Sequence, residues 1–452
     1  MGYWSTPKRD AGTEAPTGRG GHGTVALDDN KLLVFGGADR TPAGFNDLWL
    51  LELVAGHEHW TKITPKLGSG QKKPVPRSGC SLTLVGSKVY IFGGQEPASG
   101  AILDELLILE VGSWELSTQV PAAAAAAGPQ QKRHPARHSH VAGIFERDSI
   151  IVFGGSGLRG PLNDVWAFST QTQEWRCLSQ GLQPAECPEP REMAAGCVIS
   201  DAGLFVHGGR GAEGEILGDV AIFDGRAGKW VLVQTTPYAR CAHTATNAVL
   251  VHQAQQQGPQ PAQQQALPQQ QPGLQQAQQQ GQQASDEPVQ AQLSMEAQHS
   301  QDGQAPVGSA PEHHQQLANA QPVSPQEAQQ QQPSSAAAGA AASSTGSPSH
   351  ASNVLLFGGF TGEAVSNKLL QLSFVRQPTP GGGASLRAEL RPVKAQPPAG
   401  EATVATGSVI ASPPARFAHS AVALQRAEEV DIVVFGGVNQ TDDLCDVIIW
   451  TL

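Results

Sequence analysis

Short apolar runs that end in a pair of glycines recur six times along this chain of 452 residues. Each run is rich in Val, Leu, Ile and Phe, which favour strands, and is followed by a polar stretch and a second apolar run. The pattern predicts one repeated antiparallel unit, because internal repeats outweigh the prior of two or three average-sized domains. The six glycine-ended runs are Leu32–Gly37, Val89–Gly94, Ser149–Gly155, Leu204–Gly209, Val354–Gly359 and Ile432–Gly437.

Four strands, named a to d, are predicted in each repeat. Strand a follows an Arg that usually has a His three residues later, and strand b is the glycine-ended run. An Asn-Asp pair or a related turn signal opens strand c. Strand d lies around a Trp that stands 20 to 23 residues past the second glycine in four copies. The Arg and third-residue pairs are Arg19/His22, Arg77/Cys80, Arg137/His140, Arg191/Ala194, Arg240/His243 and Arg416/His419, and the strand d tryptophans are Trp60, Trp114, Trp175 and Trp230.

These recurring residues are interpreted as structural, since a group needed in every repeat is expected to hold the repeat together. Paired glycines permit backbone angles closed to other residues and allow a neighbour to approach closely. The Arg and His side chains are expected to satisfy backbone groups, and a recurrent acid at the start of strand c to bind turn amides. The repeat glycines are Gly36 and Gly37, Gly93 and Gly94, Gly154 and Gly155, Gly208 and Gly209, Gly358 and Gly359, and Gly436 and Gly437; the acids are Asp47, Asp104, Asp164, Asp219 and Asp446.

The combination of paired glycines, a following Asn-Asp and a spaced Trp resembles the Kelch repeat. That resemblance implies a β-propeller in which each repeat is one four-stranded blade around a central channel. The expected fold is therefore all-β, with six blades. The expected blades are residues 19–63, 77–118, 137–179, 191–234, 240–393 and 416–452, the last completed by residues 3–6.

The last blade is expected to take its strand d from the N-terminus. The sequence ends before any strand d Trp follows the sixth glycine pair. Trp4 precedes the first repeat's Arg19 in the way that each strand d Trp precedes the next repeat. We therefore expect Tyr3–Thr6 to supply the missing strand, which would remove an exposed sheet edge.

Blade five is interrupted by residues 252–351, which are rich in Gln, Ala, Pro and Ser and contain six acids but no Lys or Arg. Such a composition cannot bury enough apolar surface to fold, so a disordered insertion in the a–b loop is predicted. Strand d of this blade lacks Trp; Leu386–Val393 is expected to form it, followed by a linker over Gln396–Pro414. The alanine tract Ala122–Ala127 is expected to be a loop between blades two and three.

Composition narrows the class of protein further. A formal net charge of −11 without a basic region argues against nucleic-acid binding. No apolar run reaches 18 residues, so no membrane span is expected. The six cysteines include no C-x-x-C pair, which favours reduced thiols in a cytoplasmic, monomeric propeller. The opening residues also fit the loose pattern for myristoylation of Gly2, but a structural role for Trp4 is the preferred interpretation.

The sequence contains no catalytic or cofactor-binding constellation that we recognise. It has no Gly-x-Ser-x-Gly, phosphate-binding loop or His-Glu-x-x-His. Galactose oxidase, which has Kelch-like blades, needs tyrosines and a Cys–Tyr crosslink at its copper, and this chain has only three tyrosines. In the iron motif of nitrile-specifier Kelch proteins, Phe223 stands where His should follow Glu215 and Asp219. We therefore expect no enzyme activity, cofactor or metal, with an enzyme using an unrecognised metal site as an open alternative.

Recognition of another protein is the expected function. The b–c and d–a loops would share one face, which the insertion leaves unobstructed, and Kelch proteins commonly bind partners there. Basic residues on this face would suit an acidic partner, whereas the preferred alternative is a solvated rim in which nearby acids balance them. The predicted partner-binding residues are Arg40, Lys72, Lys73, Arg133, Arg159 and Arg210, and the balancing acids are Asp39, Glu96, Glu213 and Glu215.

The chain also resembles stand-alone six-bladed Kelch proteins of the Rab-GTPase effector type. The likeness lies in the YWSTP opening, the LFVHGG copy and the ending IVVFGGVNQTDDLCDVII. It implies a non-enzymatic scaffold or adaptor, with a GTPase effector in vesicle trafficking as the specific form. The alternative is a substrate-recognition subunit recruited to a ubiquitin ligase by another chain.

Overall fold

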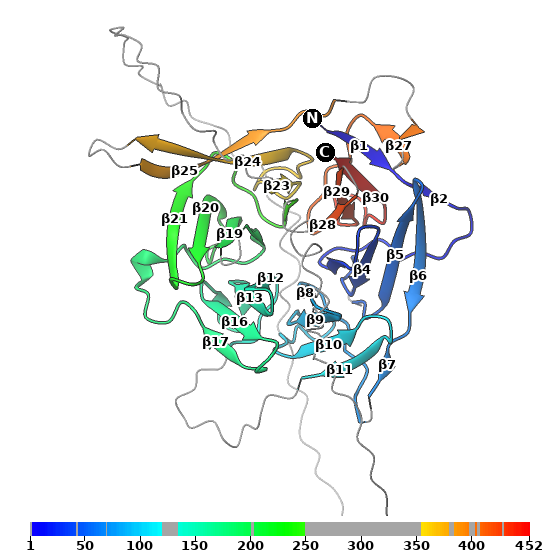
Figure 1. Cartoon of the computed structure of the whole chain (residues 1–452), viewed down its shortest axis with the longest axis horizontal. Coiled ribbons are helices and arrows are strands. Elements are labelled where there is room, and N and C mark those ends of the chain that lie inside the picture. Colours follow the sequence, from blue (N-terminus) through cyan, green and yellow to red (C-terminus); the bar gives the residue numbers. More distant parts are fainter. Residues whose placement is uncertain are drawn as a thin grey trace, which may run out of the picture. The chain divides into compact units, whose positions relative to one another are not determined.

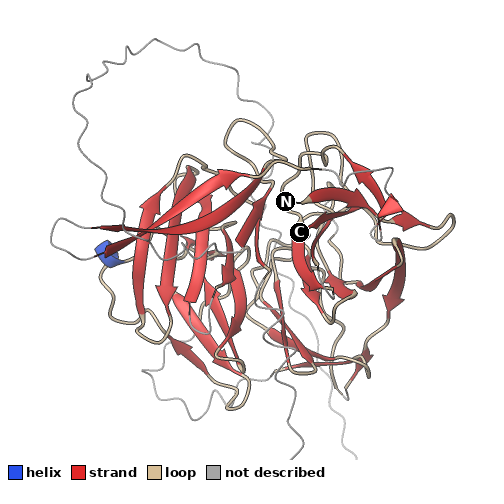
Figure 2. Cartoon of the chain, turned by 45° about the horizontal axis from the view of Figure 1, so that its top comes forward, coloured by secondary structure: helices blue, strands red, loops and turns tan. Residues whose placement is uncertain are grey.

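The structure is a six-bladed β-propeller (Figure 1). It is a computed structural model that describes residues 2–41, 44–68, 70–119, 134–199, 203–248, 354–378, 384–396, 403–404, 407–426 and 429–452. Within these residues nearly all regular structure is β-strand, and η1 (Pro184–Glu186) is a single 3-10 turn (Figure 2). The prediction of an all-β propeller with six blades is confirmed. The predicted insertion 252–351 and the tract Ala122–Ala127 lie outside the described residues.

Each blade is an antiparallel sheet whose strands a to d run from the central channel outward. Blade one is β3 (Gly23–Ala26), β4 (Lys31–Phe35), β5 (Leu48–Val54) and β6 (His57–Ile63); blade two is β8 (Ser81–Val85), β9 (Lys88–Phe92), β10 (Leu106–Glu110) and β11 (Glu115–Thr118); blade three is β12 (Val141–Phe145), β13 (Ser149–Phe153), β16 (Val165–Ser169) and β17 (Trp175–Cys177). Blade four is β18 (Ala195–Val198), β19 (Gly203–Arg210), β20 (Ile216–Asp224) and β21 (Lys229–Thr235); blade five is β22 (Thr244–Asn247), β23 (Val354–Phe357), β24 (Leu369–Pro378) and β25 (Ala384–Pro392); blade six is β28 (Ser420–Gln425), β29 (Val430–Phe435), β30 (Val447–Thr451) and β1 (Tyr3–Thr6).

The N-terminal strand closes the last blade, as predicted. β1 pairs antiparallel with β30, so that Trp4 lies opposite Trp450. The Trp4 ring is buried between Trp450, 5.1 Å away between ring centroids, and Phe357 of blade five at 4.9 Å. Gly2 is also buried here, and its carbonyl accepts a hydrogen bond of 2.9 Å from the Gln396 amide. Both chain ends are therefore built into one sheet.

The linker predicted over Gln396–Pro414 is partly wrong, because it contains two strands. β27 (Gly407–Ile410) pairs with the outer edge of β1, and β26 (Thr403–Val404) pairs with β27. The positive φ of Gly407, +120°, allows the chain to turn closely against the Thr6 carbonyl. A four-residue strand next to a Pro- and Ala-rich stretch gives little sequence signal, since its stability comes from pairing with β1.

Neighbouring blades pack through one aromatic contact that the repeat explains. The Phe before the glycine pair in one blade lies against the strand d Trp of the next blade, as in Phe92 with Trp175, whose ring centroids are 4.8 Å apart. Such pairs stabilise by about 0.5–1.5 kcal/mol beyond the area that they bury. The same contact joins Phe153 to Trp230 at 5.1 Å, Phe435 to Trp60 at 5.0 Å and Phe357 to Trp4 at 4.9 Å, and Phe35 lies in one core cluster with Trp114.

Candidate functional site

The repeated Arg side chains hold the loops on the b–c and d–a face from within. In blade three, the buried Arg137 donates to the Gly154 carbonyl at 2.9 Å and forms a two-pronged ion pair with Asp164 at 2.9 and 3.0 Å. We expected these acids to bind turn amides; they bind the guanidinium instead, which fixes the start of strand c. In blade two the expected Asp104 is replaced in this role by Glu105. The other pairs are Arg19–Asp47, Arg191–Asp219 and Arg416–Asp446.

The glycine pairs let one blade approach the next. The Gly37 amide donates to the Arg77 carbonyl of the following blade at 2.8 Å, and a side chain on Gly36 would lie 2.7 Å from the same oxygen. Both glycines have positive φ, +70° and +93°, which other residues adopt at a cost. The contact recurs around the ring and ends with Gly437 donating to Arg19 at 2.8 Å.

A closed cycle of six backbone hydrogen bonds surrounds the channel at the same face. In each blade the second residue after the repeat Arg has positive φ, as Ser139 and Met193 have at 54°. Its amide donates to the equivalent carbonyl of the preceding blade, so the cycle closes only with six blades. The donors and acceptors, all 2.7 to 2.9 Å apart, are Gly21 to Ala418, Gly79 to Gly21, Ser139 to Gly79, Met193 to Ser139, Ala242 to Met193 and Ala418 to Ala242.

The repeat histidines join adjacent blades through hydroxyl groups. His22 contacts Ser420 at 2.8 Å, His140 contacts Ser81 at 2.8 Å, and His419 contacts Thr244 at 3.1 Å. Each hydroxyl begins strand a of the preceding blade. Where that first residue is Gly23 or Val141, the next blade carries Cys80 or Ala194 in place of His, so no imidazole is left unpaired there.

The interface between blades four and five uses a different imidazole partner. Blade four begins strand a with Ala195, which offers no hydroxyl, and His243 instead contacts His207 at 2.8 Å between ring nitrogens. His207 occupies the position held by Phe in the other blades. Burial, with the charges of Arg240 and Arg191, lowers the pKa of His207 to about 3, so both rings are neutral at pH 7. This pair is a contact between blades four and five.

Blade five also lacks the acid that pairs with its Arg. Lys368 stands where the other blades have Asp or Glu, and among the described residues Arg240 donates only to the Gly358 carbonyl, at 2.9 Å. The buried Nε of Arg240 has no hydrogen-bond partner within the same ranges, and burial lowers the pKa of the Arg240 guanidinium to about 10. Blade five is therefore the one blade in which no carboxylate of a described residue balances the charge of the repeat Arg.

Replacing Lys368 by Asp is expected to stabilise the propeller. The new carboxylate can accept from Arg240 as Asp164 does from Arg137, and a charge-assisted bond of this kind contributes about 1.5–3 kcal/mol. Chemical denaturation should show a higher midpoint at an unchanged slope. The control Lys368→Ala removes the like charge without supplying an acceptor and should gain less; equal midpoints for the two variants would contradict the pairing.

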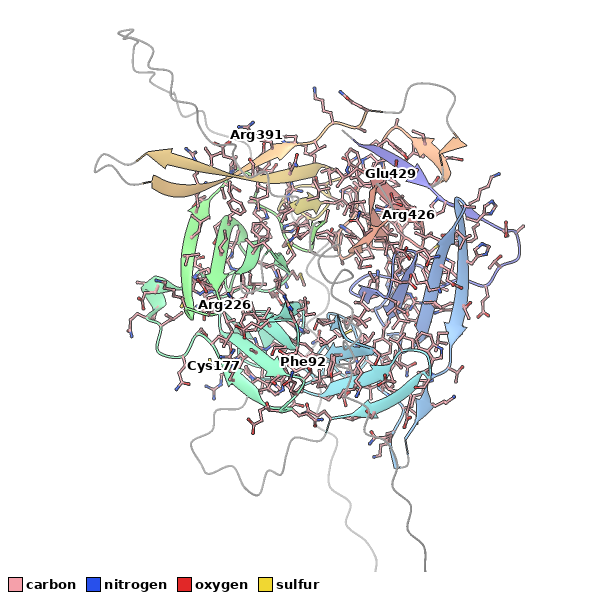
Figure 3. The ribbon with its side chains drawn as sticks, viewed as in Figure 1. Phe92, Cys177, Arg226, Arg391, Arg426 and Glu429 are labelled. Atoms are coloured by element: carbon pink, nitrogen blue, oxygen red, sulfur yellow. The ribbon has the colours of Figure 1, made fainter. Side chains whose placement is uncertain are left out.

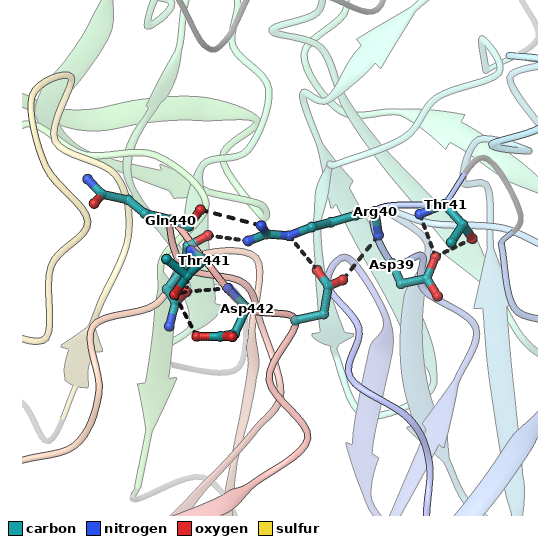
Figure 4. A network of polar contacts seen from close by, with 8 residues as sticks. Asp39, Arg40, Thr41, Gln440, Thr441 and Asp442 are labelled. Carbon is teal, nitrogen blue, oxygen red and sulfur yellow. Dashed lines mark hydrogen bonds and ion pairs between the residues drawn. The ribbon is translucent and has the colours of Figure 1, made fainter.

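Two of the six predicted basic residues, Arg40 and Arg210, contact other residues of the propeller. Arg40 belongs to the closure of the ring: its guanidinium bonds the Asn439 carbonyl at 2.7 Å and Asp443 at 3.3 Å, both in the b–c loop of blade six (Figure 4). Arg210 is paired with Glu192, with Nε and Oε1 2.9 Å apart. Both side chains are therefore committed to contacts within the propeller, which the sequence did not indicate.

Of the other four predicted basic residues, three are exposed and one lies outside the described residues. Lys72 and Lys73 are exposed on the segment between blades one and two, and Arg159 is exposed on a b–c loop of blade three. None of the three forms an ion pair with another described residue. Arg133 lies outside the described residues.

A small hairpin on this face has Leu158 and Arg159 as its turn, and the sequence analysis did not predict it. β14 (Ser156–Gly157) and β15 (Gly160–Pro161) place Leu158 at the tip, where its side chain is 92% exposed. The base is fixed, because the Ser156 amide donates to His138 at 2.9 Å and the Leu162 amide to Gly155 at 2.8 Å. A leucine between glycines in a polar loop was the signal available in the sequence.

Around the channel opening, the positions after the repeat Arg and after the glycine pair are apolar in blades five and six. Phe360 and Phe417 are half-buried there with ring centroids 6.5 Å apart, and Val438 is beside them. Blades three and four carry His138, Glu192 and Arg210 in the equivalent positions. The face thus offers an apolar pair of blades, a polar and charged pair of blades, and one projecting leucine.

Other chemistry is limited in the described part of the chain. No group of three or more His, Cys, Asp or Glu among its residues could hold a metal ion. All six cysteines are free thiols. No helix within the described ranges is long and apolar enough to cross a membrane.

These observations define a six-bladed β-propeller whose repeated residues join neighbouring blades and close the ring. The chain belongs to the KLHDC2/KLHL20/DRC7 Kelch-repeats domain family, which it matches over residues 2–134 and 124–255. The Kelch resemblance is confirmed at the level of the family.

Three proteins serve as examples of those whose sequences are similar to this chain. Host cell factor 1 of Homo sapiens is 31% identical over 211 residues, covering 43% of this chain and 10% of that protein. Acyl-CoA-binding domain-containing protein 4 of Arabidopsis thaliana is 30% identical over 196 residues, 43% of this chain and 26% of its own length. Adagio-like protein 1 of Oryza sativa subsp. japonica is 33% identical over 183 residues, which cover 38% of this chain and 26% of that protein. The matches therefore span about a quarter or less of these relatives.

Proposed function

We propose that this propeller is a non-enzymatic adaptor that binds a partner protein through its b–c and d–a face. The observation that carries the proposal is the Leu158 side chain, 92% exposed at the tip of a hairpin whose base is hydrogen-bonded to the blade. A preordered apolar side chain loses little conformational entropy on binding and can fill a pocket on the partner. Membership of a Kelch family supports the same class of function.

The charge on this face suits a partner with acidic residues near that pocket. Arg159 follows Leu158 directly and can form a charge-assisted bond at the edge of the contact. Lys72 and Lys73 would add attraction at longer range, and a similar role is proposed for Arg133. Arg40 and Arg210 would contribute less, because each already has an acidic neighbour.

Replacing Leu158 by Asp is expected to weaken capture of the partner about tenfold or more, because a hot-spot apolar contact becomes a buried charge. Quantitative affinity purification from cells measures this for the full chain. Val54→Asp is the matched control: Val54 is 48% exposed at the c–d turn, on the opposite face, and its variant should retain capture. Arg159→Glu should weaken capture by a smaller factor. Equal losses for Leu158→Asp and Val54→Asp would contradict the proposed face.

The identities of the captured proteins distinguish the specific roles. Recovery of Rab-type GTPases with a preference for the GTP-bound form would support an effector in vesicle trafficking. Recovery of cullin components would support the substrate-recognition subunit of a ubiquitin ligase. Both forms place the protein in the cytoplasm and require no cofactor.

A further inference from the structure

The outer edges of the blades are covered unequally. In blades one and two a short strand adds in parallel to strand d: β2 (Lys8–Arg9) on β6 and β7 (Lys66–Leu67) on β11. In blade six, β27 adds to β1. Among the described residues, blades three, four and five end on β17, β21 and β25 (Figure 1). This fold therefore accepts an added strand at its rim, and three rims carry none in the described chain.

Two of those three edges are protected against pairing with a strand of another chain, in ways that proteins commonly use. β17 has only three residues. The Gln234 side chain bonds both the amide and the carbonyl of Ala388 in β25, at 3.1 and 2.8 Å, which occupies that edge. β25 also carries charged residues and ends at Pro392.

The edge of β21 is neither short nor occupied by a side chain of another described strand, and its one irregularity is a register shift at Val231, opposite Ile222 and Phe223. The strand has seven residues and contains no Pro, and Lys229 at its start is its one charged residue. Trp230 and Leu232 pack inward, whereas Val231 and Val233 are 50% and 51% exposed. Two half-exposed valines on a strand whose one strand neighbour among the described residues is β20 are the features that β-strand addition uses for affinity and for specificity.

The charge around β21 decides between possible occupants. Lys229 is exposed, and so is Arg387, which precedes the Ala388 that Gln234 contacts; neither forms an ion pair with another described residue. The cations Arg226 and Arg391 lie on the flanking turn and on β25 (Figure 3), and each is paired with an acid, Glu146 and Glu389 respectively. Lys229, which lies opposite Asp224 in the sheet, and Arg387 are cations without an ion-pair partner among the described residues, and they favour an acidic segment.

We propose that β21 is a docking edge at which an acidic, extended segment of a partner protein adds as a fifth strand of blade four. Its alternate side chains would be β-branched and apolar to pack on Val231 and Val233. An acidic residue at one end would lie near Lys229. This site is on the rim and is independent of the face that carries Leu158.

The test uses a labelled peptide, Glu-Val-Thr-Val-Thr-Val-Thr-Val-Glu, titrated with the full chain at low ionic strength and followed by fluorescence anisotropy. Val233→Glu is expected to weaken binding about tenfold or more through repulsion at the edge, and Lys229→Glu, a second variant at an exposed position, to weaken it as well. Leu67→Glu is the matched control, because Leu67 is 42% exposed on a rim where β7 already occupies the edge of β11. It should bind as the unaltered chain does.

Two further probes separate strand addition from simple charge attraction. The same peptide N-methylated at alternate residues keeps its side chains but loses main-chain donors, and it should bind at least about tenfold more weakly. A Lys-ended peptide should also bind more weakly. The proposal is overturned by absence of binding, by equal binding of the N-methylated or Lys-ended peptide, or by light scattering that shows a dimer dissolved by Val233→Glu. Binding should persist in Leu158→Asp, which separates this site from the proposed adaptor face.

Discussion

Lowering the pH from 7 to 5 is expected to destabilise the propeller by at least about 4 kcal/mol through two histidines alone. His22 and His207 are buried, and the pKa of each is lowered to about 3. An unfolded histidine titrates near 6.5, so each contributes about 2 kcal/mol of lost stability between pH 7 and pH 5. Typical domains have a free energy of unfolding of only about 5–15 kcal/mol, so this is a large fraction.

The direction follows from proton binding in the two states. Between pH 6.5 and 3 the histidines are protonated in the unfolded chain but stay neutral in the folded one. Their contribution to the free energy of unfolding, which is fully present above pH 6.5, is therefore lost as the pH falls. Burial is the main cause for His22, with Arg19 adding to it and Asp47 opposing it. The pKa values of His140, His243 and His419 lie well below 6.5 for the same reason, and these residues act in the same direction. The pKa of Asp431 is raised by burial, so this group opposes the trend at lower pH.

Denaturant unfolding at pH values from 8 to 5 measures this slope. The double variant His207→Phe/His243→Leu removes two buried imidazoles from one interface and should flatten the slope by up to about 2.7 kcal/mol per pH unit. His59→Gln, at an exposed imidazole, is the control for a change in surface charge. An unaltered chain whose unfolding free energy changes by less than 1 kcal/mol over this range would contradict the expectation.

The fold could be predicted from the sequence because its determinants recur. Six copies of a glycine pair and an Arg report the same local requirement six times, and a spaced Trp accompanies them in four copies, with Trp4 as the fifth strand d Trp. The partners of those residues were harder to assign. Asp104 and Glu105 are adjacent, and only the direction of each side chain decides which of them meets Arg77.

The candidate site depended on contacts between residues far apart in the sequence. Arg40 looked available until the ring brought the Asn439–Asp443 loop beside it. His207 stands where the other repeats have Phe. It provides a polar partner for His243, which Ala195 cannot provide because it has no hydroxyl group. The role of a residue that departs from the repeat becomes clear only when its contact in the neighbouring blade is known. A comparison of the repeats in the sequence does not show which residues of two blades are in contact.

Replacing Trp4 by Ala is expected to cost about 3–5 kcal/mol, the usual loss for a fully buried aromatic side chain. The ring packs on Trp450 and on Phe357, so its removal opens a cavity at the interface between blades five and six. β1 is also held on both edges, by β30 and by β27. Any loosening of β1 therefore leaves one edge of β30 and one edge of β27 unpaired, and the loss should fall at the upper end of the range.

Denaturant unfolding and limited proteolysis test this contribution. Trp4→Phe keeps an aromatic ring between the same neighbours and should lose less than half as much stability as Trp4→Ala. Deletion of residues 1–6 removes β1 entirely, and cleavage within Gly407–Leu452 should then precede cleavage elsewhere, because β27 and β30 lose their shared partner. A Trp4→Ala chain within 1 kcal/mol of the unaltered protein would mean that closure rests on the inner contacts alone: the amide cycle around the channel and the bond from Gly437 to Arg19.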